Sequence, residues 1–142
     1  MKKTVLASRI GKAGIGVTVA AAATIAFSGT AHAADVYGKT GNGCADAGGT
    51  YSYSWTGSAQ GRDTYNAYFD ITVRDKCPGD GWAGALYLSY WKYQNGQWKW
   101  TSQQRVKVNG TYSTPQTNVD GLQINVCNYL PDRAPSGCSR VW

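Results

Sequence analysis

Alternation of apolar and polar residues predicts short β-strands along most of this chain. In residues 50–56, three large rings alternate with threonine and serine, and residues 65–74 and 122–126 repeat the pattern with mainly aliphatic residues. A period of two puts successive side chains on opposite faces of a strand, so each segment has one buried and one wet face. No segment shows helical periodicity over ten residues. The pattern predicts an all-β fold, a small antiparallel β-sandwich or barrel.

Residues 86–108 are predicted to form one β-hairpin closed by Asn95-Gly96, the dipeptide best suited to a type I′ turn. The turn fixes the register and puts four large rings on one face in two directly opposed pairs, Tyr93 with Trp98 and Trp91 with Trp100. A second Asn-Gly, at 109–110, predicts another tight turn that pairs residues 105–108 with residues 111–114.

The stripe of four rings is either a wall of the core or a binding surface. The opposite face of the hairpin carries Leu86 and Leu88 but then Lys92 and Lys99 near the turn. This charge favours burial of the rings. Exposure would instead give a flat, rigid platform edged by the two lysines, of the kind that protein interfaces use.

The first 33 residues have the pattern of a secretory signal peptide. Basic residues precede an apolar run over residues 13–27, which ends in the small-residue exit Ala31-His32-Ala33, so we expect cleavage before Ala34. Four of the 14 basic residues and none of the 8 acidic residues lie in this segment, which leaves ten against eight. The basic charge of the whole chain therefore gives no support to a nucleic-acid or membrane partner.

The predicted mature chain divides into two parts. Residues 34–49 are polar and glycine-rich, which predicts an extended or mobile N-terminal arm anchored at Cys44, with Tyr37 as a contact for a partner. Residues 50–142 then form the β-sandwich domain. About 109 residues suffice for one core but not for two.

Four cysteines remain after the predicted cleavage, and an even count in a small exported domain indicates two disulfides. Three connectivities are possible. We favour Cys44–Cys77 and Cys127–Cys138, because the second pair brackets a proline- and glycine-containing loop that a local bridge would order. A zinc site is the competing interpretation, but the sequence has no Cys-x2-Cys pair and no histidine after residue 32.

The predicted mature domain lacks His, Glu and Met. Histidine is the usual general base near neutral pH, so Ser–His–Asp and Cys–His sites are excluded. Seven of the eight aspartates fall in turns or at strand ends. Asp70 alone lies within a predicted strand, where we expect a cross-strand Lys or Arg as its partner. Residues 75–81 lack the ligand spacing of a calcium loop. We expect no enzymatic activity, no cofactor and no metal.

Two resemblances suggest a class of function. Trp91-Lys92-Tyr93 beside a hairpin turn resembles the Trp-Arg-Tyr signature of the small secreted α-amylase inhibitors of streptomycetes, with Lys in place of Arg and different cysteine spacings. In type, the export signal, size and two-disulfide β character are similar to small secreted actinobacterial proteins. These include the bridging subunit of the streptomycete umbrella toxin particles, which links a lectin subunit to a stalked toxin.

The sequence thus predicts a secreted monomer that works by binding. The first hypothesis is an adaptor in an extracellular assembly, with another secreted protein, lectin-like or toxin, as its partner. The alternatives are an inhibitor of an extracellular hydrolase, in which residues 91–93 form the inserted loop, and a carbohydrate-binding module. The expected partner-binding residues are Trp91, Lys92, Tyr93, Trp98, Trp100 and Tyr37.

Overall fold

The computed structural model describes residues 31–142, so the predicted signal peptide lies almost wholly outside the described residues. It contains eight strands: β1 (His32–Lys39), β2 (Ala45–Ala59), β3 (Arg62–Asp75), β4 (Ala83–Gln94), β5 (Gln97–Val108), β6 (Gly110–Tyr112), β7 (Gln116–Tyr129) and β8 (Ser136–Arg140). Within residues 31–142 there is no helix, and hence none that is long and apolar enough to cross a membrane. The all-β prediction is confirmed.

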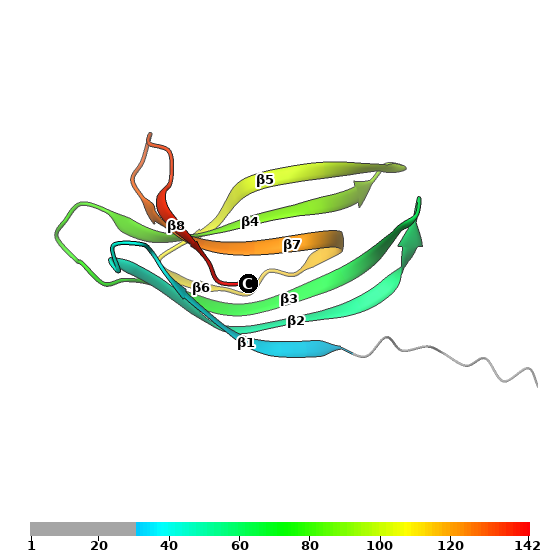
Figure 1. Ribbon diagram of the computed structural model, residues 1–142, viewed down its shortest axis with the longest axis horizontal. Coiled ribbons are helices and arrows are strands. Elements are labelled where there is room, and N and C mark those ends of the chain that lie inside the picture. The colour runs from blue at the N-terminus through cyan, green and yellow to red at the C-terminus, as the bar shows by residue number, and fades with distance from the viewer. Residues whose placement is uncertain (1–30) are drawn as a thin grey trace, which may run out of the picture.

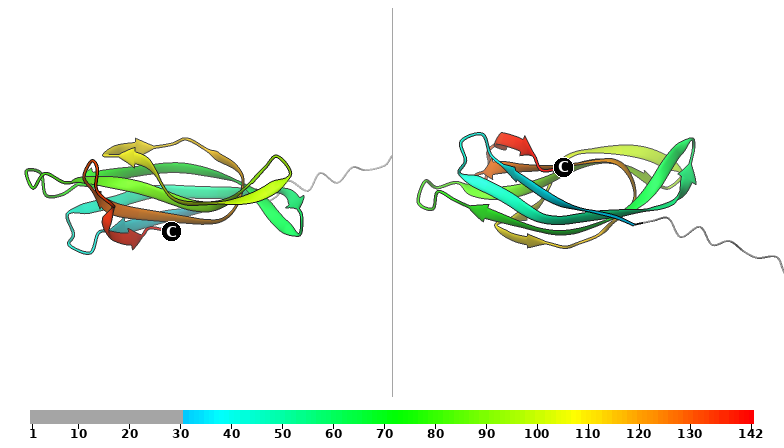
Figure 2. Two further views of the ribbon diagram at one scale, coloured as in Figure 1. Left: turned by 90° about the horizontal axis from the view of Figure 1, so that it is seen from above. Right: turned by 60° about the horizontal axis from the view of Figure 1, so that its bottom comes forward.

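The strands form one antiparallel sheet, which is not closed, in the order β1-β2-β3-β7-β4-β5. The short strands β6 and β8 pair with β3 and β7. The sheet folds over on itself where β3 pairs with the first residues of β7, which gives two layers (Figure 1). One layer holds β1, β2, β3 and β6, and the other holds β4, β5 and β7. Figure 2 shows the same sandwich-like arrangement from two further sides.

The core lies between these layers and follows the predicted alternation. On β3, every second residue from Ala67 to Val73 is buried. On β4, all residues from Gly84 to Tyr90 are buried, and Leu86, Leu88 and Tyr90 belong to the main core. Ile124 and Val126 of β7 complete the second layer of the core. Each strand therefore turns its apolar face inward because burying that face is the main favourable term in folding.

Residues 34–49, predicted as an extended or mobile N-terminal arm, are largely extended and pair with the rest of the sheet. Residues 32–39 form the edge strand β1, which pairs with residues 46–53 of β2. Val36 is buried in the core, and a Cβ on Gly38 would lie 2.7 Å from the carbonyl oxygen of Arg140. The glycine in β1 thus allows close packing against the C-terminal segment, which is a different requirement from mobility.

The predicted pairing of residues 105–108 with residues 111–114 across the second Asn-Gly is wrong. Asn109 and Gly110 both have positive φ, 36° and 97°, as a tight turn requires. However, β6 pairs with β3 of the other layer, with Tyr112 opposite Ile71. The ring of Tyr112 packs 5.3 Å from that of Phe69 in the core. Burial of this ring favours a crossing to the other layer over a local hairpin.

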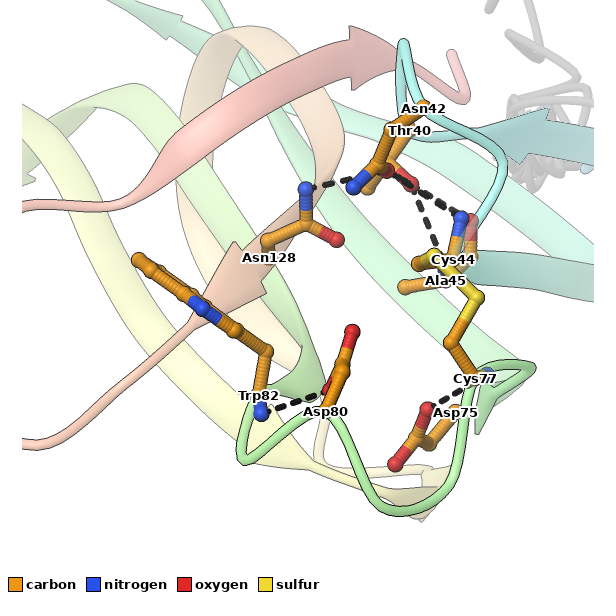
Figure 3. The surroundings of a disulfide bond; sticks show 9 residues. All are labelled: Thr40, Asn42, Cys44, Ala45, Asp75, Cys77, Asp80, Trp82 and Asn128. Carbon is orange, nitrogen blue, oxygen red and sulfur yellow. Dashed lines mark hydrogen bonds between the residues drawn. A yellow bond between two sulfur atoms is a disulfide. The ribbon is translucent and has the colours of Figure 1, made fainter.

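Both favoured disulfides, Cys44–Cys77 and Cys127–Cys138, are confirmed, and the described residues contain no free cysteine. Figure 3 shows the first bridge beside a small polar network. In it, Oδ1 of Asn42 accepts hydrogen bonds from the Thr40 hydroxyl, the Cys44 amide and Nδ2 of Asn128. The bridges are consistent with an oxidising, extracellular environment.

Candidate partner-binding surface

The register predicted for the aromatic hairpin is confirmed. Tyr93 lies opposite Trp98, and Trp91 lies opposite Trp100. The ring centroids within these pairs are 5.3 and 5.5 Å apart, with the planes tilted by 53° and 54°. Asn95 and Gly96 have φ values of 53° and 75°, as a type I′ turn requires. The four rings are called the aromatic hairpin face below.

The aromatic hairpin face points away from the core, so the favoured expectation of burial in the core is wrong. The irregular positions in this part of the sheet add residues to β5 and β7, which leaves the alternation of β4 intact. Tyr90 belongs to the core, so Trp91 and Tyr93 lie on the outer side of the strand. None of the four rings belongs to the core cluster of the described residues or packs against it.

Arg62, at the start of β3, covers part of the aromatic hairpin face. Its guanidinium carbon lies 4.6 Å from the ring centroid of Trp91 and 5.4 Å from that of Trp98. Both Nε and Nη2 of Arg62 lie 3.0 Å from Oδ2 of Asp120 on β7. The ion pair holds the cation over the rings, where the negative face of an indole attracts it.

Two hairpin tips meet beside this cation. The indole N–H of Trp98 donates to the carbonyl oxygen of Ala59 at 2.9 Å, and Nε2 of Gln60 donates to the carbonyl oxygen of Gly96 at 2.7 Å. The β2–β3 and β4–β5 tips lie at the same end of the molecule, opposite the β3–β4 loop (Figure 1 and Figure 2). These bonds fix the Trp98 ring and the turn at Gly96 against the other tip, and they leave Trp98 partly exposed.

The predicted site residues differ in how accessible they are. Trp100 is 42% exposed, whereas Trp91, Tyr93 and Trp98 are half-buried. Lys92 pairs with Lys99 and, by alternation, lies on the side opposite the rings. Residues 91–93 lie within β4 and not in a loop, and therefore do not present three side chains to one partner surface.

Tyr37 lies far from the hairpin in the order of the sheet, because β1 and β5 are its two edges. Its ring is 62% exposed and lies beside Gly48, where an added Cβ would be 3.2 Å from Cδ2 of Tyr37. The ring borders a shallow hollow of about 530 Å³ that Asp70 and Arg74 also line. The structure thus separates Tyr37 from the other predicted partner-binding residues.

The ion pair expected for Asp70 is wrong. Its cross-strand neighbour on β2 is Thr50, and within residues 31–142 no Lys or Arg forms a salt bridge with it. The salt bridges involve other aspartates: Asp120 binds Arg62, and the nearly buried Asp46 lies 3.5 Å from Arg74 and 3.9 Å from Lys76. A cross-strand partner depends on the order of the strands, which alternation does not determine.

One cluster in the described residues has the composition of a metal site. Ligand atoms of Cys44, Cys77 and Asp80 lie within 4.8 Å of one another. The two sulfur atoms are joined in a disulfide, so neither is the thiolate that binds metals. Asp80 instead accepts a hydrogen bond from the Trp82 amide, which closes the loop (Figure 3).

Sequence reasoning missed Arg62 and Asp120 as parts of this surface. They are 58 positions apart and reach the hairpin only because β3 and β4 both pair with β7. A local signal was present only for Asp120, whose Asp-Gly dipeptide indicates a bend in the strand.

Comparisons of the chain with models of protein families, with curated proteins and with solved structures gave no match.

Proposed function

We propose that the protein is a secreted, non-catalytic binding module whose aromatic hairpin face docks another secreted protein. It would act as an adaptor or subunit of an extracellular assembly. The observation that carries this proposal is the position of the four rings outside the core, held by a paired arginine and by the neighbouring hairpin tip. A surface that is already ordered loses little conformational entropy on binding.

The composition of the surface supports a protein partner. Trp, Tyr and Arg are the residues most enriched among interface hot spots, and this surface combines three Trp, one Tyr and Arg62. Trp100 is its most exposed ring. It is therefore the ring that would lose the largest fraction of exposed surface when a partner covers this face.

A carbohydrate ligand is the second candidate, and it rests on a different face. Tyr37 lies open beside the hollow on β1, β2 and β3, where Asp35, Asp70 and Arg74 provide hydrogen-bonding groups around an exposed ring. An aromatic ring with polar groups placed around it suits a sugar, which has both apolar and hydroxyl faces.

The two candidates are separated by affinity capture from the culture medium of the producing organism. The immobilised baits are the wild type, Trp100→Ala and the control Trp55→Ala, which removes an equally exposed Trp outside the hairpin. We expect a protein that is retained by the wild type and the control but lost by Trp100→Ala. A retained hydrolase with blocked activity would indicate the inhibitor alternative. Retention of glycan without protein, weakened by Tyr37→Ala alone, would reject the proposed protein partner.

A further inference from the structure

A pocket that is open to solvent at the rim of the core is lined mainly by aromatic rings. Its volume is about 240 Å³. Tyr51, Tyr53 and Tyr65 line it from β2 and β3, and Trp142 and Leu122 from the other side. This volume is large enough for a small organic molecule or group, and it remains although the surrounding rings are in contact with one another.

The rings border the pocket from several directions. The planes of Tyr51 and Tyr53 are inclined by 31°, those of Tyr51 and Trp142 by 50°, and those of Tyr53 and Tyr65 by 85°, with centroids 5.3–5.7 Å apart. Four aromatic rings thus border one pocket, and the face of each ring carries partial negative charge.

One acidic residue lies at the pocket beside the rings. Asp120 lines the pocket, and its one salt-bridge partner, Arg62, also lies over the hairpin rings. The pKa of the Tyr65 hydroxyl is raised, first by desolvation and then by the nearby charges of Asp63 and Asp120. Arg62 pairs with Asp120 at 3.0 Å and offsets the charge of this carboxylate, so the attraction for a cation comes mainly from the ring faces.

We propose that this pocket binds a small organic cation carrying a quaternary ammonium group, of the type found in choline. Aromatic cages recognise such groups, because the cation is attracted to the ring faces and is only weakly hydrated. One ring that lines the pocket, Tyr53, already stacks on a second ring of the chain, that of His32, with centroids 5.3 Å apart. Cleavage before Ala34, as the sequence predicts, would remove His32 and free that face of Tyr53.

The test compares choline with its neutral isostere, in which a tert-butyl group replaces the trimethylammonium group. Proton NMR follows the methyl signal of each ligand as it is titrated with protein isolated from culture medium. Ring currents should shift the methyl signal of choline upfield, and the isostere should bind about tenfold more weakly, which corresponds to about 1.4 kcal/mol. Equal binding of both ligands, or binding of neither, would overturn the proposal.

A wall variant and a matched control locate the binding. Trp142→Leu keeps an apolar side chain but removes one ring of the pocket, whereas Trp55→Leu makes the same change at an exposed position outside the pocket. We expect about tenfold weaker choline binding by Trp142→Leu and unchanged binding by Trp55→Leu. Tyr53→Leu is the second wall variant if Trp142→Leu does not fold. Choline binding that survives both wall variants would refute the site.

The same cation can be free or part of a lipid head group. A parallel sedimentation with phosphatidylcholine vesicles distinguishes these sources. Choline binding together with vesicle retention would assign the site to a head group, and choline binding alone would assign it to the free cation. Neither result depends on the aromatic hairpin face, so this proposal and the proposed function can fail separately.

Discussion

Among residues 31–142, burial changes the acid strength of several tyrosines. Burial is the largest cause that raises the pKa values of Tyr51, Tyr65, Tyr87 and Tyr90 above their usual value of 10.0. Tyr51 shows the largest effect, because it lies in the core beside a second phenol, Tyr53. All four therefore stay protonated in the folded protein at a pH where the unfolded chain has begun to ionise.

This difference predicts that stability decreases in alkali. A raised pKa in the folded state means that the stabilisation is fully present below pH 10 and is lost as the pH rises beyond it. Thermal unfolding followed by circular dichroism should show a falling melting temperature above pH 10. Tyr51→Phe removes the most affected phenol and should flatten that decrease, whereas Tyr68→Phe, at an exposed ring, should follow the wild type. Equal slopes for all three proteins would contradict the role assigned to burial.

At the scale of elements, turn residues were sufficient to predict strand pairing only where the two strands are neighbours in the sequence. Asn95-Gly96 determined which rings of the hairpin oppose each other, because a two-residue turn fixes the register of its strands. Asn109-Gly110 is the same dipeptide and also has positive φ values, yet the strand after it joins the other layer. The burial of Tyr112 decides that outcome, and it depends on contacts with Ile71 and Phe69, which lie 41 and 43 positions away.

The turn conformation predicts a specific cost at Gly96. Its φ of 75° lies in the left-handed region, and Gly96→Ala should lower the free energy of unfolding by about 1 kcal/mol. Gly41→Ala is the matched control, because that site is equally open but has no positive φ. Urea unfolding of both variants measures the difference. A loss at Gly41 as large as that at Gly96 would show that backbone strain is not the cause.

At the scale of the whole molecule, the fold class and both disulfides were predictable from the sequence. For the aromatic hairpin face, the rings were predictable but their exposure and their contact with Arg62 were not. Alternation gave the strands and the stripe of rings, but it could not say which face the sheet would bury. Which face is buried depends on how the sheet folds over where β3 pairs with β7. The same arrangement brings Arg62 to the rings. The glycines of residues 34–49 suggested mobility. Their packing could not be foreseen locally, because Arg140, which contacts Gly38, lies 102 positions further along the chain.

The predicted export signal and the two bridges together predict one observable form of the molecule. Protein from culture medium should begin at Ala34 and contain no free thiol, because each cysteine is paired. Intact mass and thiol titration under denaturing conditions measure both properties. Reactive thiols in freshly secreted protein, or a mass that includes the first 33 residues, would be inconsistent with this form.

The central claim is that the aromatic hairpin face binds a partner and is not part of the core. Its most direct test measures Trp100→Ala twice, by titration calorimetry with the captured partner and by thermal unfolding. We predict binding weakened by about 2 kcal/mol or more, as for hot-spot truncations, with a melting temperature close to that of the control Trp55→Ala. A variant that binds normally but loses about 3–5 kcal/mol of folding free energy, as core truncations do, would contradict the account.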